Sequence, residues 1–223
     1  MFSSNTLILD SILQKSAYYH YLFFIIQLYV QEIKLNYILI SMEVIMKKEI
    51  EVFDYANVIM KAVKSGVLLT TKTDDKVNSM TISWGTLGIE WGNPIFTVFV
   101  REHRFTKFQL EKNPEFTINI PLGEFNKKIL GVCGTKSGHV SDKINELGLS
   151  LEEPNSISVP GIKELPLTLE CKVIYKQKQD DNEITEEIKN TCYPQDVDSS
   201  FHGANKDFHI AYYGEIVSAY IIE

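Results

Sequence analysis

Glycine and proline are confined to one part of this chain. All 12 glycines and all 7 prolines lie after residue 46, whereas 28 of the first 45 residues are hydrophobic. Turns, helix ends and strand boundaries depend on these two residue types more than on most others. We therefore expect residues 46–223 to form the folded domain and residues 1–45 to be a separate segment.

The first 45 residues match neither a membrane helix nor a signal peptide. Their most apolar stretch, residues 17–30, has 14 residues and contains His20 and Gln27. About 20 apolar residues are needed to span a bilayer. No basic residue opens the chain, and no small-residue cleavage site follows Val30. We therefore expect no membrane partner and no secretion.

Two explanations of residues 1–45 stay open. The segment is rich in Ile, Tyr, Phe, Leu, Asn and Lys, which AT-rich non-coding DNA tends to encode. If Glu43 and Val44 are encoded GAG GTN, the message reads GGAGGT just before the Met46 codon, as a bacterial ribosome-binding site does. The segment is then translated upstream sequence, and Met46 is the start. The alternative is an N-terminal helix that packs on the domain or on a partner.

Bulk composition excludes few functions. A formal charge of -7 disfavours a nucleic-acid partner, and 44% hydrophobic and 23% charged residues are ordinary for a globular domain. The three cysteines, Cys133, Cys171 and Cys192, are odd in number and too widely spaced for a CxxC metal or redox pair. We expect a reducing, cytoplasmic setting.

Within residues 46–223, strand patterns predominate. Strands are expected at 67–73, 77–84, 95–100, 116–120, 165–178 and 209–222, the first two joined by a polar turn at 74–76. Helices are expected after the N-caps Asp54, Thr106 and Ser141 and over residues 125–133. This pattern predicts one mainly β domain, a closed antiparallel barrel with peripheral helices.

The segment 78–84, Asn-Ser-Met-Thr-Ile-Ser-Trp, is the first candidate for a binding surface. Alternate side chains of a strand point to opposite faces, so one face here carries a row of hydroxyl groups. The hydroxyl face has Ser79, Thr81 and Ser83, and the other face has Asn78, Met80, Ile82 and Trp84. Taken alone, the segment favours an ordinary solvated sheet face over a binding surface.

Two further segments have the composition of an anion site. Arg101 and Arg104 lie where a buried strand ends and a helix begins near Thr106. Guanidinium groups and free helix amides bind phosphate well, although surface arginines beside an N-cap explain the pattern equally. Residues 134–138, Gly-Thr-Lys-Ser-Gly, are followed by Lys143, and small residues let backbone N–H groups approach an anion. The GxxxxGK[ST] spacing of a P-loop is absent.

His209 opens the last expected strand and is the candidate catalytic group, although a lone histidine there is more often structural. The remaining histidines, His103, His139 and His202 among them, lack HExxH spacing, and no Ser-His-Asp order stands out. Zinc chemistry and hydrolysis are therefore disfavoured, and we expect no metal. No GxGxxG fingerprint is present. The tract 194–207 is either a surface loop, which we favour, or a cover for the site.

Five segments in chain order resemble the flavin reductase-like family of FMN-binding split barrels. They are 78–85, 98–106, 116–121, 133–138 with Asp142 and Lys143, and His209 with 214–216. The resemblance covers nearly all of residues 46–223, and the order is more specific than any single piece. One departure is His139, where the family pattern has an arginine after the Ser-Gly pair. A neutral histidine there weakens the attraction for phosphate.

The resemblance implies a six-stranded antiparallel Greek-key barrel that forms a homodimer and binds FMN near the subunit interface. It places the strand 78–84 along the flavin ring, and the two arginines and the segment after residue 134 near the phosphate and ribityl chain. The implied flavin-binding residues are Asn78, Ser79, Met80, Thr81, Ser83, Trp84, Arg101, Arg104, Thr106, Asn119, Ser137, Gly138 and Lys143.

The resemblance also implies flavin-dependent electron transfer. The favoured function is an NAD(P)H-dependent flavin reductase, in which NADH or NADPH is the co-substrate and electrons pass to a flavin, an iron compound or a protein acceptor. The alternative is a non-enzymatic FMN electron carrier of the flavoredoxin type. A third class, a related barrel that binds haem or pyridoxal phosphate, predicts a different visible spectrum.

Overall fold

The computed structural model describes residues 23–34, 47–196 and 206–223. The chain divides into two units, Met1–Ile45 and Met46–Glu223. In the first unit, residues 23–34 form a helix whose apolar side chains, such as Phe23 and Phe24, are exposed. None of the helices in the described ranges is long and apolar enough to cross a membrane. The rest of residues 1–45, and residues 197–205 of the 194–207 tract, lie outside the described residues.

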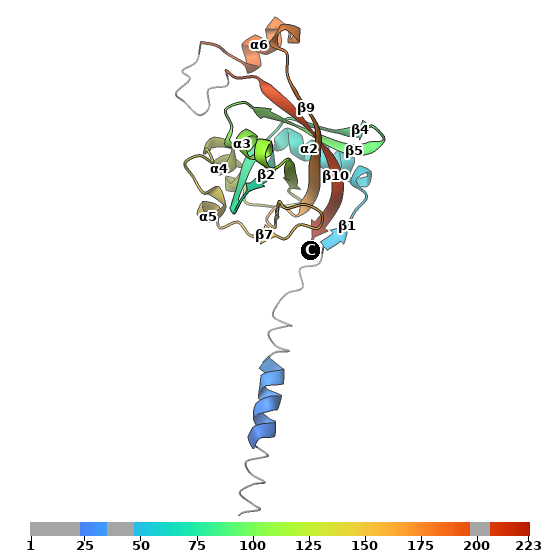
Figure 1. Ribbon diagram of the computed structural model, residues 1–223, viewed down its shortest axis with the longest axis vertical. Helices are drawn as coiled ribbons and strands as arrows, with labels where there is room; N and C mark the ends of the chain where they lie inside the picture. Colours follow the sequence, from blue (N-terminus) through green and yellow to red (C-terminus); the bar gives the residue numbers. More distant parts are fainter. Residues whose placement is uncertain (1–22, 35–46, 197–205) are drawn as a thin grey trace, which may run out of the picture. The chain divides into compact units, whose positions relative to one another are not determined.

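An eight-stranded antiparallel sheet forms most of the second unit (Figure 1). Its strands are β1 (Lys47–Glu49), β2 (Val67–Thr73), β3 (Lys76–Ile82), β4 (Gly85–Glu90), β5 (Asn93–Arg101), β6 (Glu115–Ile120), β9 (Leu167–Lys178) and β10 (His209–Ile222). The order is β3-β2-β6-β9-β10-β5-β4, and β1 pairs with β10. Two short strands, β7 (Leu151–Glu152) and β8 (Gly161–Ile162), form a separate pair.

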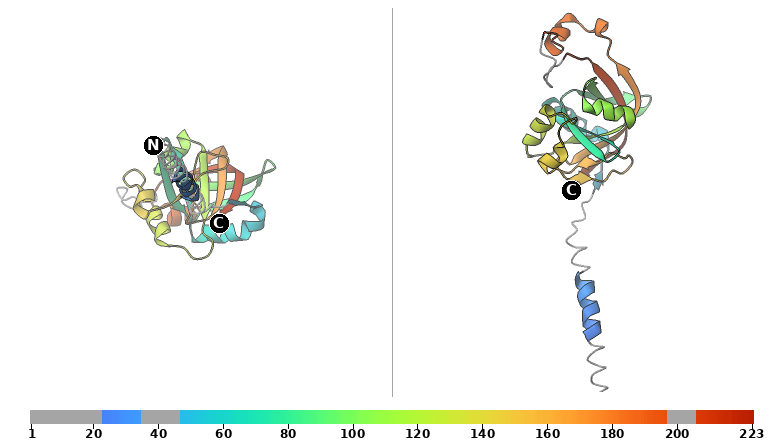
Figure 2. Two further views of the ribbon diagram at one scale, coloured as in Figure 1. Left: turned by 90° about the horizontal axis from the view of Figure 1, so that it is seen from below. Right: turned by 60° about the vertical axis from the view of Figure 1, so that its left-hand side comes forward.

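The sheet curls into a split barrel because two consecutive strands occupy its opposite ends. β3 and β4 end the strand order, yet only Ser83 and Trp84 separate them in the chain. Three Cα–Cα steps reach at most about 11 Å, so the two sheet edges must lie close together. No ladder of hydrogen bonds joins β3 to β4 in the part of the chain that the structure describes. The curvature is visible in both views of Figure 2.

The predicted mainly β split barrel is confirmed, but the sheet has eight strands rather than six. The predicted closure is not found, because β3 and β4 are not paired in the described residues. β10 is 14 residues long and pairs with β5 only from His209 to Glu215. Its last residues, 220–222, therefore leave an edge that β1 fills. β4 adds a hairpin to β5 through Trp91 and Gly92, whose φ angles are 52° and 80°.

The helices lie around the sheet and confirm some of the predicted boundaries. They are α2 (Ala56–Ser65), α3 (Phe105–Lys112), α4 (Lys128–Thr135), α5 (Lys143–Leu147) and α6 (Glu186–Cys192), with 3₁₀ turns η1 (Val52–Tyr55) and η2 (Asp181–Glu183). The three predicted N-caps are wrong. Arg104 caps α3, so Thr106 lies inside its first turn, and Asp54 lies in η1. Asp142 caps α5 instead of Ser141, because its carboxylate accepts from the Asn145 N–H.

Two hydrophobic clusters cover the two faces of β2. Leu69 packs inside the barrel with Phe96 and Phe116. Its neighbour Leu68 points the other way, into a cluster with residues of α4 and α5 such as Ile129. The hydroxyl face of β3 lies on this second side, and Thr81 Oγ1 donates to the Leu130 carbonyl of α4 at 2.7 Å. The solvated-face interpretation of this strand is therefore wrong, because helices cover it.

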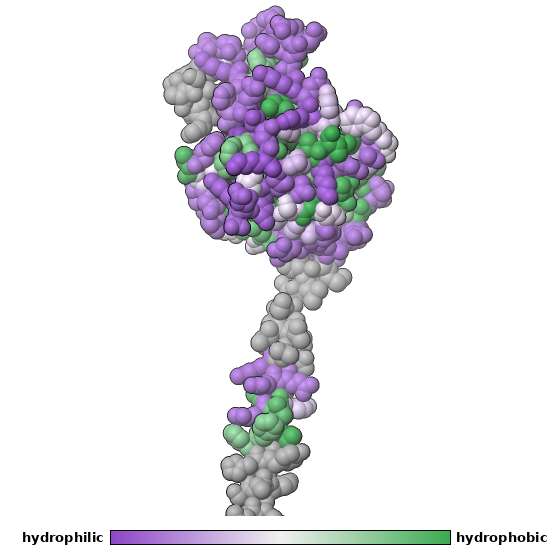
Figure 3. Space-filling view, viewed as in Figure 1, coloured by the Kyte–Doolittle hydropathy of each residue, from purple (hydrophilic) through white to green (hydrophobic). Residues whose placement is uncertain are grey.

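The segment between β9 and β10 contains η2 and α6 among its described residues. Neither element has a buried residue. Figure 3 shows this upper part of the second unit as mostly hydrophilic. We call the described parts of it, residues 179–196 and 206–208, the excursion. Its last residues, 206–208, lead into β10, which pairs with β5 at Arg101.

Candidate functional site

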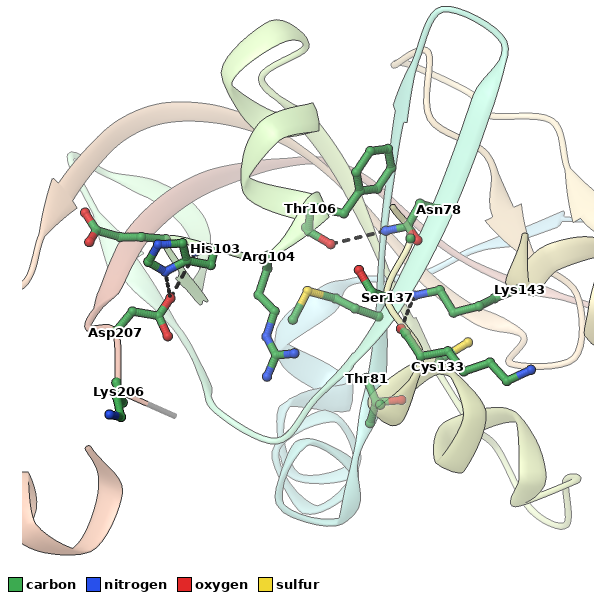
Figure 4. A pocket seen from close by; sticks show the side chains of 16 residues that line it. Asn78, Thr81, His103, Arg104, Thr106, Cys133, Ser137, Lys143, Lys206 and Asp207 are labelled. Atoms are coloured by element: carbon green, nitrogen blue, oxygen red, sulfur yellow. Dashed lines mark hydrogen bonds and ion pairs between the residues drawn. The ribbon is translucent and has the colours of Figure 1, made fainter. Parts of the chain in front are cut away.

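A cavity of about 560 Å³, here called the main cleft, opens beside the first turn of α3 (Figure 4). It lies between β3, the β5–α3 turn, the end of α4 and the start of α5. Its lining residues are Asn78, Met80, Thr81, Glu102, His103, Arg104, Phe105, Thr106, Cys133, Gly134, Lys136, Ser137, Gly138, Lys143, Lys206 and Asp207. Five separate stretches of sequence therefore meet at one cavity.

A smaller cavity of about 220 Å³, here called the side pocket, adjoins the main cleft. The two share Met80, Thr81 and Arg104. The side pocket is otherwise lined by Ile82, Ser83, Trp84, Phe99, Arg101 and His209. An elongated ligand can therefore occupy both cavities at once.

The structure brings most of the predicted site residues to these two cavities. The main cleft receives Asn78, Met80, Thr81, Arg104, Thr106, Ser137, Gly138 and Lys143. The side pocket adds Ser83, Trp84, Arg101 and His209. Ser79 and Asn119 line neither cavity.

Ser79 and Asn119 belong to a buried polar network instead. Ser79 Oγ lies 2.8 Å from Thr70 Oγ1, which donates to Asn119 Oδ1 at 2.9 Å. The Asn119 amide donates to Thr168 Oγ1 at 3.2 Å. The network crosses β3, β2, β6 and β9, and it satisfies polar groups that have no access to water. These two side chains stabilise the sheet, and the structure does not place them at the site.

Lys143 is a buried cation at the base of the main cleft. The residue is 3% exposed, and its Nζ donates to the Lys136 carbonyl at 3.3 Å. Desolvation by burial lowers the pKa of Lys143, and the nearby Arg104 acts in the same direction. Glu146, one turn further on, pairs with Lys136 at 2.5 Å. Lys143 itself has no salt bridge to any carboxylate of the described residues, so the cleft is suited to a ligand that brings an anion.

The loop after α4 packs closely against the first turn of α3. A Cβ on Gly138 would lie 2.4 Å from Asn78 Oδ1 and 2.6 Å from the Phe105 ring, so only glycine fits. The Asn78 amide donates to Thr106 Oγ1 at 3.3 Å. Within the described residues, the backbone N–H groups of Ser137 and Gly138 have no acceptor. Loop amides and the first-turn amides of α3 thus lie around one cavity, the arrangement that binds anions.

Arg101 lies at the side pocket and makes its contacts with the excursion. Its guanidinium donates to the Asp207 carbonyl at 2.5 Å and to the Cys192 carbonyl at 3.0 Å. It also lies 4.9 Å from the centre of the Tyr193 ring. Burial lowers the pKa of Arg101, while Asp207 opposes that change. The guanidinium therefore fastens both described ends of the excursion to β5.

His209 is the cross-strand neighbour of Arg101 and is buried. Its Nδ1 lies 2.8 Å from the Tyr193 hydroxyl, and its ring lies 5.0 Å from that of Trp84. Desolvation, followed by the charge of Arg101, lowers the pKa of His209 to about 4. The imidazole is therefore neutral at pH 7, and it can hold a polar group but is a poor proton donor there.

Several residues of the main cleft were not identified from the sequence. His103 and Asp207 lie side by side at its edge (Figure 4), and the Asp207 carboxylate accepts from the His103 backbone N–H at 3.0 Å and approaches its Nδ1 at 3.2 Å. Contacts between residues so far apart in the chain have no local sequence signal. Cys133 belongs to one of the segments that resemble the family, but it was not predicted as a site residue, because a cysteine in an apolar segment usually belongs to the hydrophobic core. Burial raises the pKa of the Cys133 thiol, with Lys143 acting against that rise.

Comparisons with known proteins found similar sequences and similar folds. An uncharacterized protein of Archaeoglobus fulgidus is 30% identical over 108 residues, a match that spans 48% of this chain and 60% of that protein. The structure of flavoredoxin from Methanosarcina acetivorans is 24% identical with a TM-score of 0.51, covering 71% of this chain and 68% of that one. An FMN-binding domain of a flavin reductases-like enzyme from Shewanella baltica is 16% identical with a TM-score of 0.55, covering 80% and 78%.

The two structural likenesses support the fold alone, and the chain spans about three fifths of the length of the curated relatives it matches. The match to a family as a whole is more extensive. The flavin reductase like domain matches residues 60–223, which include every residue that lines the main cleft and the side pocket. The chain belongs to the flavin reductase like domain family.

Proposed function

We propose that the main cleft binds the phosphate and ribityl chain of FMN. The observation that carries this proposal is Lys143, a buried cation with no carboxylate partner among the described residues. A bound phosphate supplies the missing negative charge and forms charge-assisted hydrogen bonds. Ser137 and Arg104 line the same cavity and supply further donors, as do the first-turn amides of α3.

The side pocket suits the flavin ring. Met80 and Trp84 offer apolar surfaces and Ser83 a hydroxyl group, which together resemble the usual lining of a site for a planar ligand. Trp84 is 42% exposed, so the pocket is open to a second molecule. Bound flavin supplies hydride acceptance and electron transfer, and the protein holds the ring and shapes access to it.

We infer an oxidoreductase in which NADH or NADPH is the electron donor and a flavin, an iron compound or a protein is the acceptor. Membership of the flavin reductase like family supports this function. A nicotinamide stacks on an exposed ring face and needs no nucleotide-binding motif. His209, neutral and fixed by Tyr193, can accept or donate a hydrogen bond at the edge of that pocket without changing its charge.

The visible spectrum of the purified full chain is the first test. Bound FMN gives flavin absorbance bands, and the flavin is released when the protein is denatured. Adding FMN to the apoprotein should restore the spectrum of the bound flavin. A haem or pyridoxal phosphate spectrum, or failure of the apoprotein to bind FMN, contradicts the proposal.

Anaerobic rapid mixing with NADH and with NADPH then tests the reductase. We expect the flavin absorbance to bleach with at least one nucleotide at a rate that matches turnover with an acceptor. No bleaching with either nucleotide, in a protein that binds FMN, assigns the chain to the electron carriers instead.

We also propose a homodimer. Large apolar side chains are exposed on β4, on β9 and in the β4–β5 turn, and a second copy can bury them. They are Ile89, Trp91, Ile174 and Tyr175. Sedimentation equilibrium is expected to give twice the chain mass, and Ile89→Glu is expected to weaken association. A monomer at micromolar concentration contradicts this prediction.

A further inference from the structure

Lys76 connects the β2–β3 hairpin to the loop that borders the main cleft. It is the first residue of β3, and its Nζ donates to the Gly138 carbonyl at 2.8 Å. The same ammonium lies 4.5 Å from the centre of the Phe105 ring. Lys76 does not line the main cleft. One exposed cation therefore contacts both segments that form the anion-binding wall without entering the cavity.

The two segments are already closely fitted to each other. Gly138 packs against Asn78 and Phe105, and the His139 ring meets the Phe105 ring edge-on at 4.9 Å. The His139 backbone N–H donates back to Ser137 Oγ at 3.3 Å, which fixes the turn after Ser137. Lys76 adds a charged hydrogen bond to the Gly138 carbonyl of this turn.

This contact has an effect on the neighbouring amides. Lys76 occupies the Gly138 carbonyl, as Lys143 occupies the Lys136 carbonyl. The Ser137 carbonyl accepts from two backbone N–H groups of the same turn, so each carbonyl of the loop 136–138 already has a donor. The backbone N–H groups of Ser137 and Gly138 stay without an acceptor among the described residues. The charge of Lys76 also reaches Lys143, whose pKa it helps to lower. A cation-rich wall of this kind attracts a phosphate.

We propose that Lys76 is a positioning residue for the phosphate group of the bound flavin. It holds the loop 136–138 against α3 so that the loop amides and Lys143 face one point in the cleft. The inference rests on the proposed FMN site and adds a determinant of selectivity: preference for FMN over riboflavin, which lacks the phosphate. Lys76 acts through the loop and the local field, not by contact with the ligand.

The test measures the affinities of the full-length apoprotein for FMN and for riboflavin in four forms: wild type, Lys76→Met, Lys76→Arg and Lys72→Met. We expect Lys76→Met to weaken FMN binding about tenfold and to leave riboflavin binding unchanged. Lys76→Arg keeps a donor and a cation over Phe105, so it should retain more FMN affinity than Lys76→Met. Lys72→Met is the matched control, since Lys72 lies on the same hairpin and its substitution removes the same charge.

Three results overturn the inference. They are equal FMN affinities for Lys76→Met and Lys72→Met, a parallel loss of FMN and riboflavin binding in Lys76→Met, and an arginine variant no better than the methionine variant. A wild-type protein that binds FMN and riboflavin equally contradicts the proposed phosphate site itself. Failure of the positioning role and failure of the FMN site are therefore distinguishable.

Discussion

Burial sets the protonation state of His209. The imidazole lies between Trp84 and Tyr193, and its pKa falls to about 4 because the fold removes water from it and places Arg101 nearby. The unfolded chain binds this proton near pH 6.5. Between those two values the unfolded state holds more protons than the native state, so the free energy of unfolding falls as pH falls.

The pH dependence of stability tests this assignment. Between pH 6.5 and about 4, protonation of His209 in the unfolded state should cost the native state at most about 3 kcal/mol. His209→Gln removes this contribution and flattens the urea-unfolding free energy over that range. His103→Gln is the control, because the His103 side chain is 86% exposed. Equal pH slopes for wild type and His209→Gln contradict the assignment.

At the residue scale, the sequence predicted identities better than roles. Lys143, Ser137 and Gly138, which line the main cleft, were predicted because small residues and lysines cluster within a few positions of one another. Ser79 and Asn119 were predicted as site residues but lie in the buried network. The alternation of side chains along a strand predicts which face of the sheet a side chain is on, but not which element covers that face. The sequence predicted a phosphate contact for Arg101, and the structure adds a competing role that depends on residues about a hundred positions away.

At the scale of elements, Arg101 joins the excursion to β5. Arg101→Ala removes two hydrogen bonds to main-chain carbonyls, at Cys192 and Asp207, so hydrogen exchange in residues 179–196 should become faster. FMN affinity should fall less than in Lys143→Met. A large loss of FMN affinity with unchanged exchange would instead assign Arg101 to the phosphate, as the sequence first indicated.

The contact between the loop after α4 and α3 is a second element-scale test. Gly138→Ala places a methyl group against Asn78 and Phe105, and it should destabilise the fold by about 1 to 3 kcal/mol and weaken FMN binding. Gly131→Ala, in α4, meets nothing within 4 Å and should stabilise by about 0.5 to 1 kcal/mol. Urea unfolding measures both. A Gly138→Ala protein as stable as wild type contradicts the close packing.

Element boundaries were predictable where the local signal is strong. The predicted strand at 67–73 matches β2 (Val67–Thr73), and the predicted strand at 209–222 matches β10 (His209–Ile222). β4 was missed because its turn uses Trp91 and Gly92, not the Asn-Gly pair typical of a two-residue hairpin. The predicted caps were off by one or two positions, an ordinary error when several polar residues precede a helix.

At the scale of the whole molecule, the sequence predicted the split barrel through the order of its segments, not through any contact. The structure adds what order cannot give: the curl that brings β3 near β4, and the return of Asp207 to the cleft edge. Both depend on pairings between distant residues. The cavity itself exists only because five separated stretches converge on it.

In the proposed FMN site, the buried cation Lys143 of the main cleft is held for a phosphate. Lys143→Met keeps the side-chain volume and removes the charge, so the claim makes two predictions of opposite sign. The melting temperature of the apoprotein should rise, because an unpaired buried cation destabilises the native state. The affinity for FMN should fall by on the order of tenfold to a hundredfold, with riboflavin affinity unchanged.

The decisive measurement is the FMN dissociation constant of Lys143→Met against that of wild type, by calorimetry on apoproteins whose folding is checked by thermal unfolding. A more stable protein that has lost its preference for FMN over riboflavin is the predicted result. A variant that binds FMN as tightly as wild type contradicts the claim.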